Sequence, residues 1–107
     1  MYADAVSRAY YAAFHFARAL LIASGEEPRS HGGVERLLQR DFVRTGRLTP
    51  AIGRLFSKLM KFRQDADYTA EFVFTREGAE EELGSARSFV KEAQNILTLD
   101  GFSPHPE

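Results

Sequence analysis

The feature that most constrains this chain is its hydrophobic periodicity, which is helical almost throughout and never alternates with a period of two over a useful length. The clearest example lies near the C-terminus, where apolar residues recur at gaps of 4, 3, 4, 3 and 4: Ala79, Leu83, Ala86, Val90, Ala93 and Leu97. Gaps of three and four place side chains on one face of an α-helix. The sequence therefore predicts an all-α fold.

Four helices are predicted from this spacing and from the residues that flank it. They run from about Ala3 to Ser24, from Val34 to Val43, from Pro50 through FRQDADY (residues 62–68), and from just after Thr75 to about Leu97. Gly25 is a natural residue just past a helix end, and Ser30, Thr49 and Thr75 are suitable N-caps. We expect an antiparallel up-and-down bundle over residues 1–98 and a flexible C-terminal tail over residues 99–107.

The connections and buried faces follow from the same pattern. EEPRSHGG (residues 26–33) is expected to be a loop, and EFVF (residues 71–74) a loop whose phenylalanines plug the bundle. The second helix should bury Val34, Leu37, Leu38 and Phe42, and the third Ile52, Leu55, Leu59, Phe62 and Ala66. The first helix is apolar all round, which predicts a central position. Four helices leave a thin core, so we expect a homodimer with the first helix near its interface.

Composition narrows the class of protein further. The chain has 107 residues, which suits one domain, and 44% of them are hydrophobic, enough for a single modest core. It contains no cysteine, which excludes disulfide bonds and thiolate metal sites. No apolar run is long enough to span a membrane, and the opening residues lack the pattern of a signal peptide. We expect a soluble cytoplasmic protein.

Charge is divided unevenly along the chain, although the formal net charge is only −1. Residues 29–63 contain nine Lys/Arg and two acidic residues, a net charge of +7, whereas residues 64–107 contain three basic and ten acidic residues, a net charge of −7. The basic side chains form two stripes, Arg36/Arg40/Arg44 and Arg54/Lys58/Lys61. These could bind RNA phosphates, or acidic residues of the last helix or of a second protomer could neutralise them. We expect neutralisation for about half of them.

The segment with the most chemistry to offer is FRQDADY. Arg63 could hold a phosphate through its bidentate fork, and Asp67, four residues later on the same face, could pair with Arg63 and orient it. Tyr68 could donate a hydrogen bond or stack on a base. The alternative is a structural Arg63–Asp67 ion pair with Tyr68 covering the edge of the core. A metal-independent ribonuclease would also need a histidine as acid or base, and none follows Arg63 in this helix or the next loop.

The three histidines are scattered, without the spacing of metal ligands, so we predict neither a metal site nor a cofactor. His15 lies between two phenylalanines on the first helix, which is typical of a hydrogen-bonded core histidine. His31 follows Ser30 in the glycine-bearing loop, where it could cap the second helix or meet a ligand. His105 lies in the tail and receives no role.

Three segments together resemble the HEPN domain family, named for higher eukaryotes and prokaryotes nucleotide-binding. They are SRAYYAAFHFARALL (residues 7–21), SHGGVERLL with FVRTGRL (residues 30–38 and 42–48), and FRQDADY. The resemblance covers about residues 2–97 and points to the small prokaryotic stand-alone branch. It implies a helical bundle that is often dimeric and often paired with a minimal nucleotidyltransferase in toxin–antitoxin modules. Relatives usually have a further helix before the one that contains RAYYAAFH, and the resemblance begins here only at about residue 2.

The resemblance also implies a site. Many HEPN proteins are metal-independent RNases whose motif is an arginine, four to six residues, and a histidine, with two copies meeting across the dimer. Arg63 fits the arginine, but residues 68–70 stand where the histidine belongs. The general base is therefore missing unless His15 or His31 supplies it from another helix. In some members a tyrosine near the motif receives a nucleotide from the partner enzyme, and Tyr68 is the nearest candidate here, although its offset from the arginine differs.

The leading prediction is a non-catalytic or weakly catalytic HEPN protein that binds nucleotide or RNA, and a partner nucleotidyltransferase, through a pocket near the dimer axis. Its predicted ligand-binding residues are Arg63, Asp67, Tyr68, Tyr11, His15 and His31. One alternative is a metal-independent endoribonuclease toxin in which Arg63 stabilises the transition state and His31 or His15 acts as base. A further alternative is a purely structural dimeric adaptor without affinity for nucleotides.

Overall fold

Four α-helices and one π-helical turn make up the part of the chain that the computed structural model describes, residues 2–68 and 75–99 without the side chains of residues 2, 3 and 68. In chain order they are α1 (Tyr2–Ala23), α2 (His31–Leu38), the π-helical turn η1 (Gln39–Val43), α3 (Pro50–Tyr68) and α4 (Arg76–Leu99). These residues include no strand, so the predicted all-α fold class is confirmed. The expected phenylalanine plug at residues 71–74 and the tail after Leu99 lie outside the described residues. No described helix is both long and apolar enough to cross a membrane.

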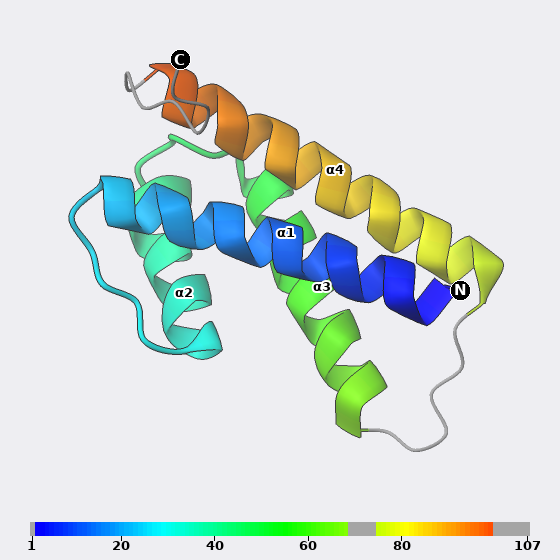
Figure 1. Ribbon diagram of the computed structural model, residues 1–107. Helices are drawn as coiled ribbons and strands as arrows, with labels where there is room; N and C mark the ends of the chain where they lie inside the picture. The colour runs from blue at the N-terminus through cyan, green and yellow to red at the C-terminus, as the bar shows by residue number, and fades with distance from the viewer. Residues whose placement is uncertain (1, 69–74, 100–107) are drawn as a thin grey trace, which may run out of the picture.

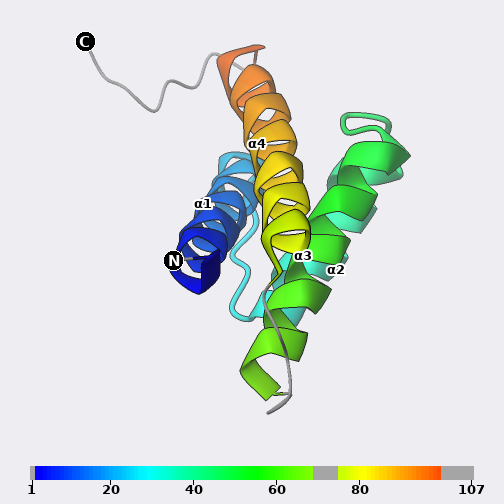
Figure 2. The same ribbon diagram turned by 90° about the vertical axis from the view of Figure 1, so that its right-hand side faces the viewer.

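The helices form two layers, with α1 beside α4 and α2 beside α3 (Figures 1 and 2). The neighbours α2 and α3 run antiparallel, whereas α1 and α4 run in the same direction. The contacts of α1 extend to all three other α-helices. This arrangement brings the beginning of α2 and the second half of α3 to the same side of α1.

Hydroxyl side chains start three of the helices. Ser30, Thr49 and Thr75 each accept a hydrogen bond from the backbone N–H three residues later, at 2.9, 3.2 and 3.0 Å, which confirms all three predicted N-caps. Gly25 has φ +90°, a conformation that side chains rarely adopt, and it follows the end of α1 as predicted. The ends of the helices are therefore encoded locally.

The expected start of the second helix at Val34 is wrong, because α2 begins at His31. Ser30 is extended and its Oγ bonds to the backbone N–H of Gly33, so both glycines of the segment fall inside the first helical turn. The helix then continues into η1, where the backbone N–H of Arg44 donates to the carbonyl of Gln39 at 2.9 Å. His31 is therefore a helical residue with a defined position and not part of a loop.

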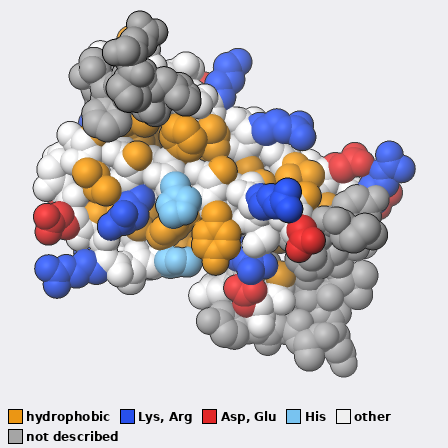
Figure 3. Space-filling view, viewed as in Figure 1, with side chains coloured by type: hydrophobic (Ala, Val, Ile, Leu, Met, Phe, Trp, Pro, Cys, Tyr) orange, Lys and Arg blue, Asp and Glu red, His pale blue; other side chains and the backbone are white. Residues whose placement is uncertain are grey.

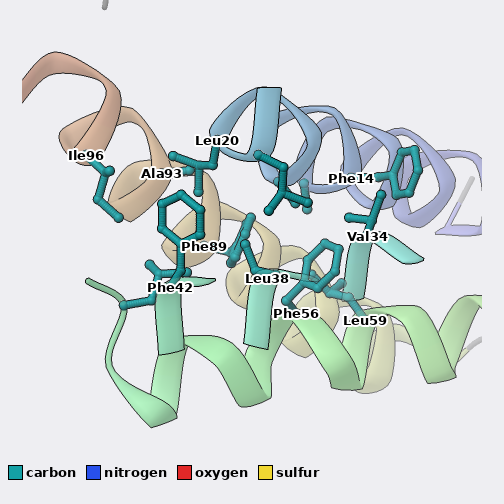
Figure 4. Close-up of a cluster of buried hydrophobic side chains, with 14 of the residues drawn as sticks. Phe14, Leu20, Val34, Leu38, Phe42, Phe56, Leu59, Phe89, Ala93 and Ile96 are labelled. Carbon is teal, nitrogen blue, oxygen red and sulfur yellow. The ribbon is translucent and has the colours of Figure 1, made fainter. Parts of the chain in front are cut away.

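The core lies between the two layers and is rich in phenylalanine (Figure 4). Phe42, Phe56 and Phe89 are fully buried, and the rings of Phe56 and Phe89 lie 4.9 Å apart between α3 and α4. The residues predicted to be buried on the second helix are all buried. On α3 the predicted buried stripe is only partly correct. Leu59 is fully buried as predicted, but Leu55 is only partly buried, and its neighbour Phe56 is fully buried instead.

The other helices do not cover the apolar surface of α1 all round within one chain. One face, from Val6 through Ala13 to Leu21, is covered by the other helices, whereas Ala12 and Ile22 are exposed. Ala9 and Ala12 of α1 instead line a shallow apolar hollow of about 290 Å³ together with side chains of α4. The apolar surface of α1 thus exceeds what three neighbouring helices cover within one chain.

The close packing between α3 and η1 can be tested at Gly53 of α3, with Gly84 of α4 as the control. A Cβ on Gly53 would lie 2.7 Å from Cγ2 of Val43, a stiff β-branched side chain, whereas a Cβ on Gly84 would meet no atom within 4 Å. Gly84→Ala should stabilise the fold by about 0.5–1 kcal/mol through helix propensity, and Gly53→Ala should destabilise it by about 1 kcal/mol or more through overpacking. Urea unfolding of both variants measures the difference. Equal stabilisation by the two substitutions would contradict the close approach.

Candidate functional site

A polar pocket of about 290 Å³ forms where α1, the beginning of α2 and the second half of α3 meet. Its lining consists of polar and aromatic side chains with one methionine: Tyr10, Tyr11, His31, Met60, Arg63, Gln64 and Asp67. On this side of α1, histidine and basic side chains lie beside hydrophobic ones (Figure 3). We call the pocket formed by the seven lining residues named above the Arg63 pocket.

Arg63 is the central cation of the pocket. Its Nη2 lies 3.2 Å from Oδ1 of Asp67, so the predicted pair four residues apart is formed. The side chain of Arg63 is 24% exposed, and its Nε is buried without a hydrogen-bond partner among the described residues. The ion pair with Asp67 therefore leaves Nε unsatisfied, while the partly exposed side chain of Arg63 lines the pocket.

Tyr10 and His31 are the two members of the pocket that contact each other most closely. The hydroxyl of Tyr10 lies 2.8 Å from Nδ1 of His31, a hydrogen-bond distance that joins α1 to the beginning of α2. The Tyr10 side chain is buried, and burial, reinforced by the neighbouring Tyr11 and opposed by Arg63, raises the pKa of Tyr10 to about 12. The phenol is therefore neutral at physiological pH.

Tyr11 lies beside Tyr10 but is open to solvent. Its ring is 44% exposed and meets Tyr10 edge-on at a centroid distance of 5.1 Å. On its other side it stacks with His15 at 6.3 Å. An exposed aromatic ring at the rim of a polar pocket is suited to stacking on a planar ligand such as a nucleobase.

The structure brings together four of the predicted site residues, Tyr11, His31, Arg63 and Asp67. His15 does not line the pocket, and its interpretation as a core histidine is wrong because it is exposed. It lies on the solvent side of α1, one turn beyond Tyr11. Tyr68 is the last residue of α3, and its side chain lies outside the described residues.

Sequence reasoning missed Tyr10 as a member of the site. The sequence indicated only that the first helix is apolar all round, and the structure shows that the ring of Tyr10 is buried. Periodicity reports the direction of a side chain but not the partner of its terminal oxygen, so no sequence signal joined Tyr10 to His31. The described part of the chain contains no group of three or more His, Asp or Glu side chains that could hold a metal ion.

The two basic stripes are partly neutralised, but of the three paired cations only Lys58 pairs with the last helix, as expected, whereas Arg40 and Lys61 pair with acidic residues nearby in the chain. Arg40 forms ion pairs with Glu26 and Asp41, and on α3 Lys61 lies 3.3 Å from Asp65. Lys58 pairs with Glu81 of α4, and its Nζ lies 4.0 Å from the buried carboxylate of Glu82. Burial raises the pKa of Glu82, and the charge of Lys58 opposes that shift. These contacts account for half of the stripe residues and connect α3 to the acidic beginning of α4.

Comparison with known proteins yields one family and several relatives. Residues 1–96 match the family described as HEPN domain, which confirms the resemblance seen in the sequence. A protein of Methanocaldococcus jannaschii named "Putative toxin" is 39% identical over 97 residues, covering 91% of this chain and 72% of the relative. A "UPF0332 protein" of Thermotoga maritima is 30% identical over 94 residues, covering 88% and 71% of the two chains.

A second protein of M. jannaschii that is also named "Putative toxin" is 31% identical over 96 residues, which cover 90% of this chain and 65% of the relative. No solved structure matches the chain. The relatives are therefore longer than the region they share with this chain.

Proposed function

Because the chain belongs to the HEPN domain family, we propose that it is a toxin-like member that binds the phosphate of a nucleotide or of RNA in the Arg63 pocket and is non-catalytic or weakly catalytic. The observation that supports the proposal is that side chains from three helices line the same pocket. Tyr11, His31 and Arg63 come from three helices and line one pocket, although up to 52 positions separate them in sequence. A purely structural ion pair between Arg63 and Asp67 would not require side chains of two other helices beside it.

Each side chain has a role that its environment supports. Arg63 lines the pocket and its side chain is 24% exposed, so its guanidinium could donate to an anionic oxygen bound there. Asp67 holds the other end of the guanidinium and orients it. Tyr11 offers an exposed ring on which a base could stack. The pocket thus combines a phosphate-binding group and a stacking surface within reach of one nucleotide.

The toxin-like assignment rests on the family and on the names of two relatives. We extend it to this chain as a proposal, with a nucleotidyltransferase as the partner protein. A homodimer is proposed as well, because the hollow lined by Ala9 and Ala12 is apolar and open.

A metal-independent endoribonuclease is the second candidate, because one specific observation favours it. His31 lines the same pocket as Arg63 and could replace the histidine missing from α3. In that mechanism His31 would take the proton of a 2′-hydroxyl while Arg63 stabilises the charge on the attacked phosphate. His15 does not line the pocket and has no part in this candidate.

Two measurements on the chain separate the candidates. Calorimetric titration with adenosine 5′-monophosphate (AMP) should show saturable binding, and single-stranded RNA incubated with the protein in EDTA should remain intact. Metal-free cleavage of the RNA would favour the endoribonuclease. Failure to bind either AMP or RNA would overturn the proposed site and leave the structural adaptor.

A further inference from the structure

The imidazole of His31 is held from two directions although the residue as a whole is exposed. Its Nδ1 lies 2.8 Å from the hydroxyl of Tyr10, and its ring packs against Phe14 at a centroid distance of 4.3 Å. Tyr10 is itself only 3% exposed and Phe14 9%. Two buried aromatic side chains of α1 therefore fix the plane and the position of this ring at the beginning of α2.

The contact between Tyr10 and His31 has one arrangement of protons that satisfies both groups. The phenol carries a proton, because burial raises its pKa to about 12. If that proton were not donated to Nδ1, it would need another acceptor, and the described part of the chain offers the Tyr10 hydroxyl no other hydrogen bond. A neutral imidazole that accepts at Nδ1 must carry its own proton on Nε2.

We infer that Tyr10 is a positioning residue, which donates a hydrogen bond to Nδ1 of His31 and thereby holds this imidazole in the tautomer with its proton on Nε2. The Nε2–H group then points away from Tyr10. His31 acts as a hydrogen-bond donor in the pocket that Arg63 also lines.

This inference deepens the proposed function, and its consequence for binding rests on that function. Two donors, Nε2–H of His31 and the guanidinium of Arg63, suit an acceptor such as a phosphate oxygen. The same tautomer opposes the endoribonuclease candidate. A general base needs an unprotonated nitrogen toward the substrate, but Nε2 is protonated and Nδ1 is occupied by Tyr10. Tyr10 therefore biases the site toward binding and away from proton abstraction.

The tautomer can be measured directly by long-range ¹H–¹⁵N NMR of the imidazole nitrogens at about pH 8.5, above the ordinary titration range of histidine. The His31 signals are assigned by their loss in His31→Asn. In the wild-type protein we expect a protonated Nε2 and an unprotonated Nδ1. In Tyr10→Phe, which keeps the buried ring, we expect a second population protonated on Nδ1. Tyr11→Phe is the matched control and should leave the His31 signals unchanged.

The experiment distinguishes failure of this inference from failure of the proposed function. A wild-type spectrum with the proton on Nδ1 would overturn the inference without any variant, and so would a Tyr10→Phe spectrum identical to that of the wild type. The affinity for AMP should fall about fivefold in Tyr10→Phe, the worth of one hydrogen bond of about 1 kcal/mol. If AMP does not bind to any of these proteins but the tautomer is as expected, the proposed function fails while the role of Tyr10 stands.

Discussion

Replacing Arg63 with alanine is expected to weaken the binding of AMP by about 10-fold to 150-fold, which corresponds to the loss of hydrogen bonds worth about 1.5–3 kcal/mol between charged groups. The reason is that Arg63 is the one arginine or lysine among the described side chains that line the pocket, so no neighbouring arginine or lysine can take its place. Calorimetric titration of wild-type and variant proteins measures the change. Arg63→Lys keeps the charge but loses the planar fork, and should recover only part of the affinity.

Arg54→Ala is the matched control for this experiment. Arg54 lies on the same helix as Arg63, is exposed, and does not line the pocket. Its removal changes the net charge by the same amount, so it should leave the affinity close to that of the wild type. Equal losses in the two variants would mean that binding depends on overall charge, and an unchanged affinity in Arg63→Ala would remove Arg63 from the site.

Replacing Phe56 with alanine is expected to cost about 3–5 kcal/mol of the free energy of unfolding. Phe56 is fully buried between the two layers, and its ring contacts that of Phe89 from α4 at 4.9 Å. A domain of this size has a total stability of about 5–15 kcal/mol, so the variant should lose a large part of it and unfold at much lower urea concentration. Circular dichroism at the helical wavelengths follows the transition.

Ile22→Ala is the control for the effect of burial. Ile22 is also a large apolar residue of a helix, but it is 51% exposed near the end of α1. Its replacement should change the stability by about 0.5 kcal/mol or less. Similar losses for the two substitutions would contradict the placement of the core between α3 and α4.

The fold was largely predictable because its signals are local. The three hydroxyl caps and Gly25 mark the ends of helices through contacts within a few residues. The buried face of α3 was less predictable, since apolar residues occur on two adjacent stripes of this helix. The contact of Phe56 with Phe89 on α4 selects between them, and spacing within a single helix contains no information about that partner.

Some contacts of the candidate site could likewise be predicted from the sequence, and others could not. Arg63 and Asp67 could be paired from the sequence, because residues four apart on a helix are neighbours. The meeting of His31 with Tyr11 depends on how the loop after α1 returns the beginning of α2 to the middle of α1, which is a property of the tertiary fold. The contact of Tyr10 with His31 depends further on the direction of one hydroxyl group, for which the sequence has no pattern.

The end of α3 contains two successive ion pairs of the same kind, Lys61 with Asp65 and Arg63 with Asp67. Each cation therefore has its counter-ion on the same helix, and the pocket presents almost no net charge to a distant molecule. Long-range electrostatic steering requires an excess of one sign of charge, so this end of the helix should accelerate the arrival of a polyanion very little. The rate at which a nucleotide enters the Arg63 pocket should then vary only weakly with ionic strength, and selection should occur after arrival, through short-range contacts.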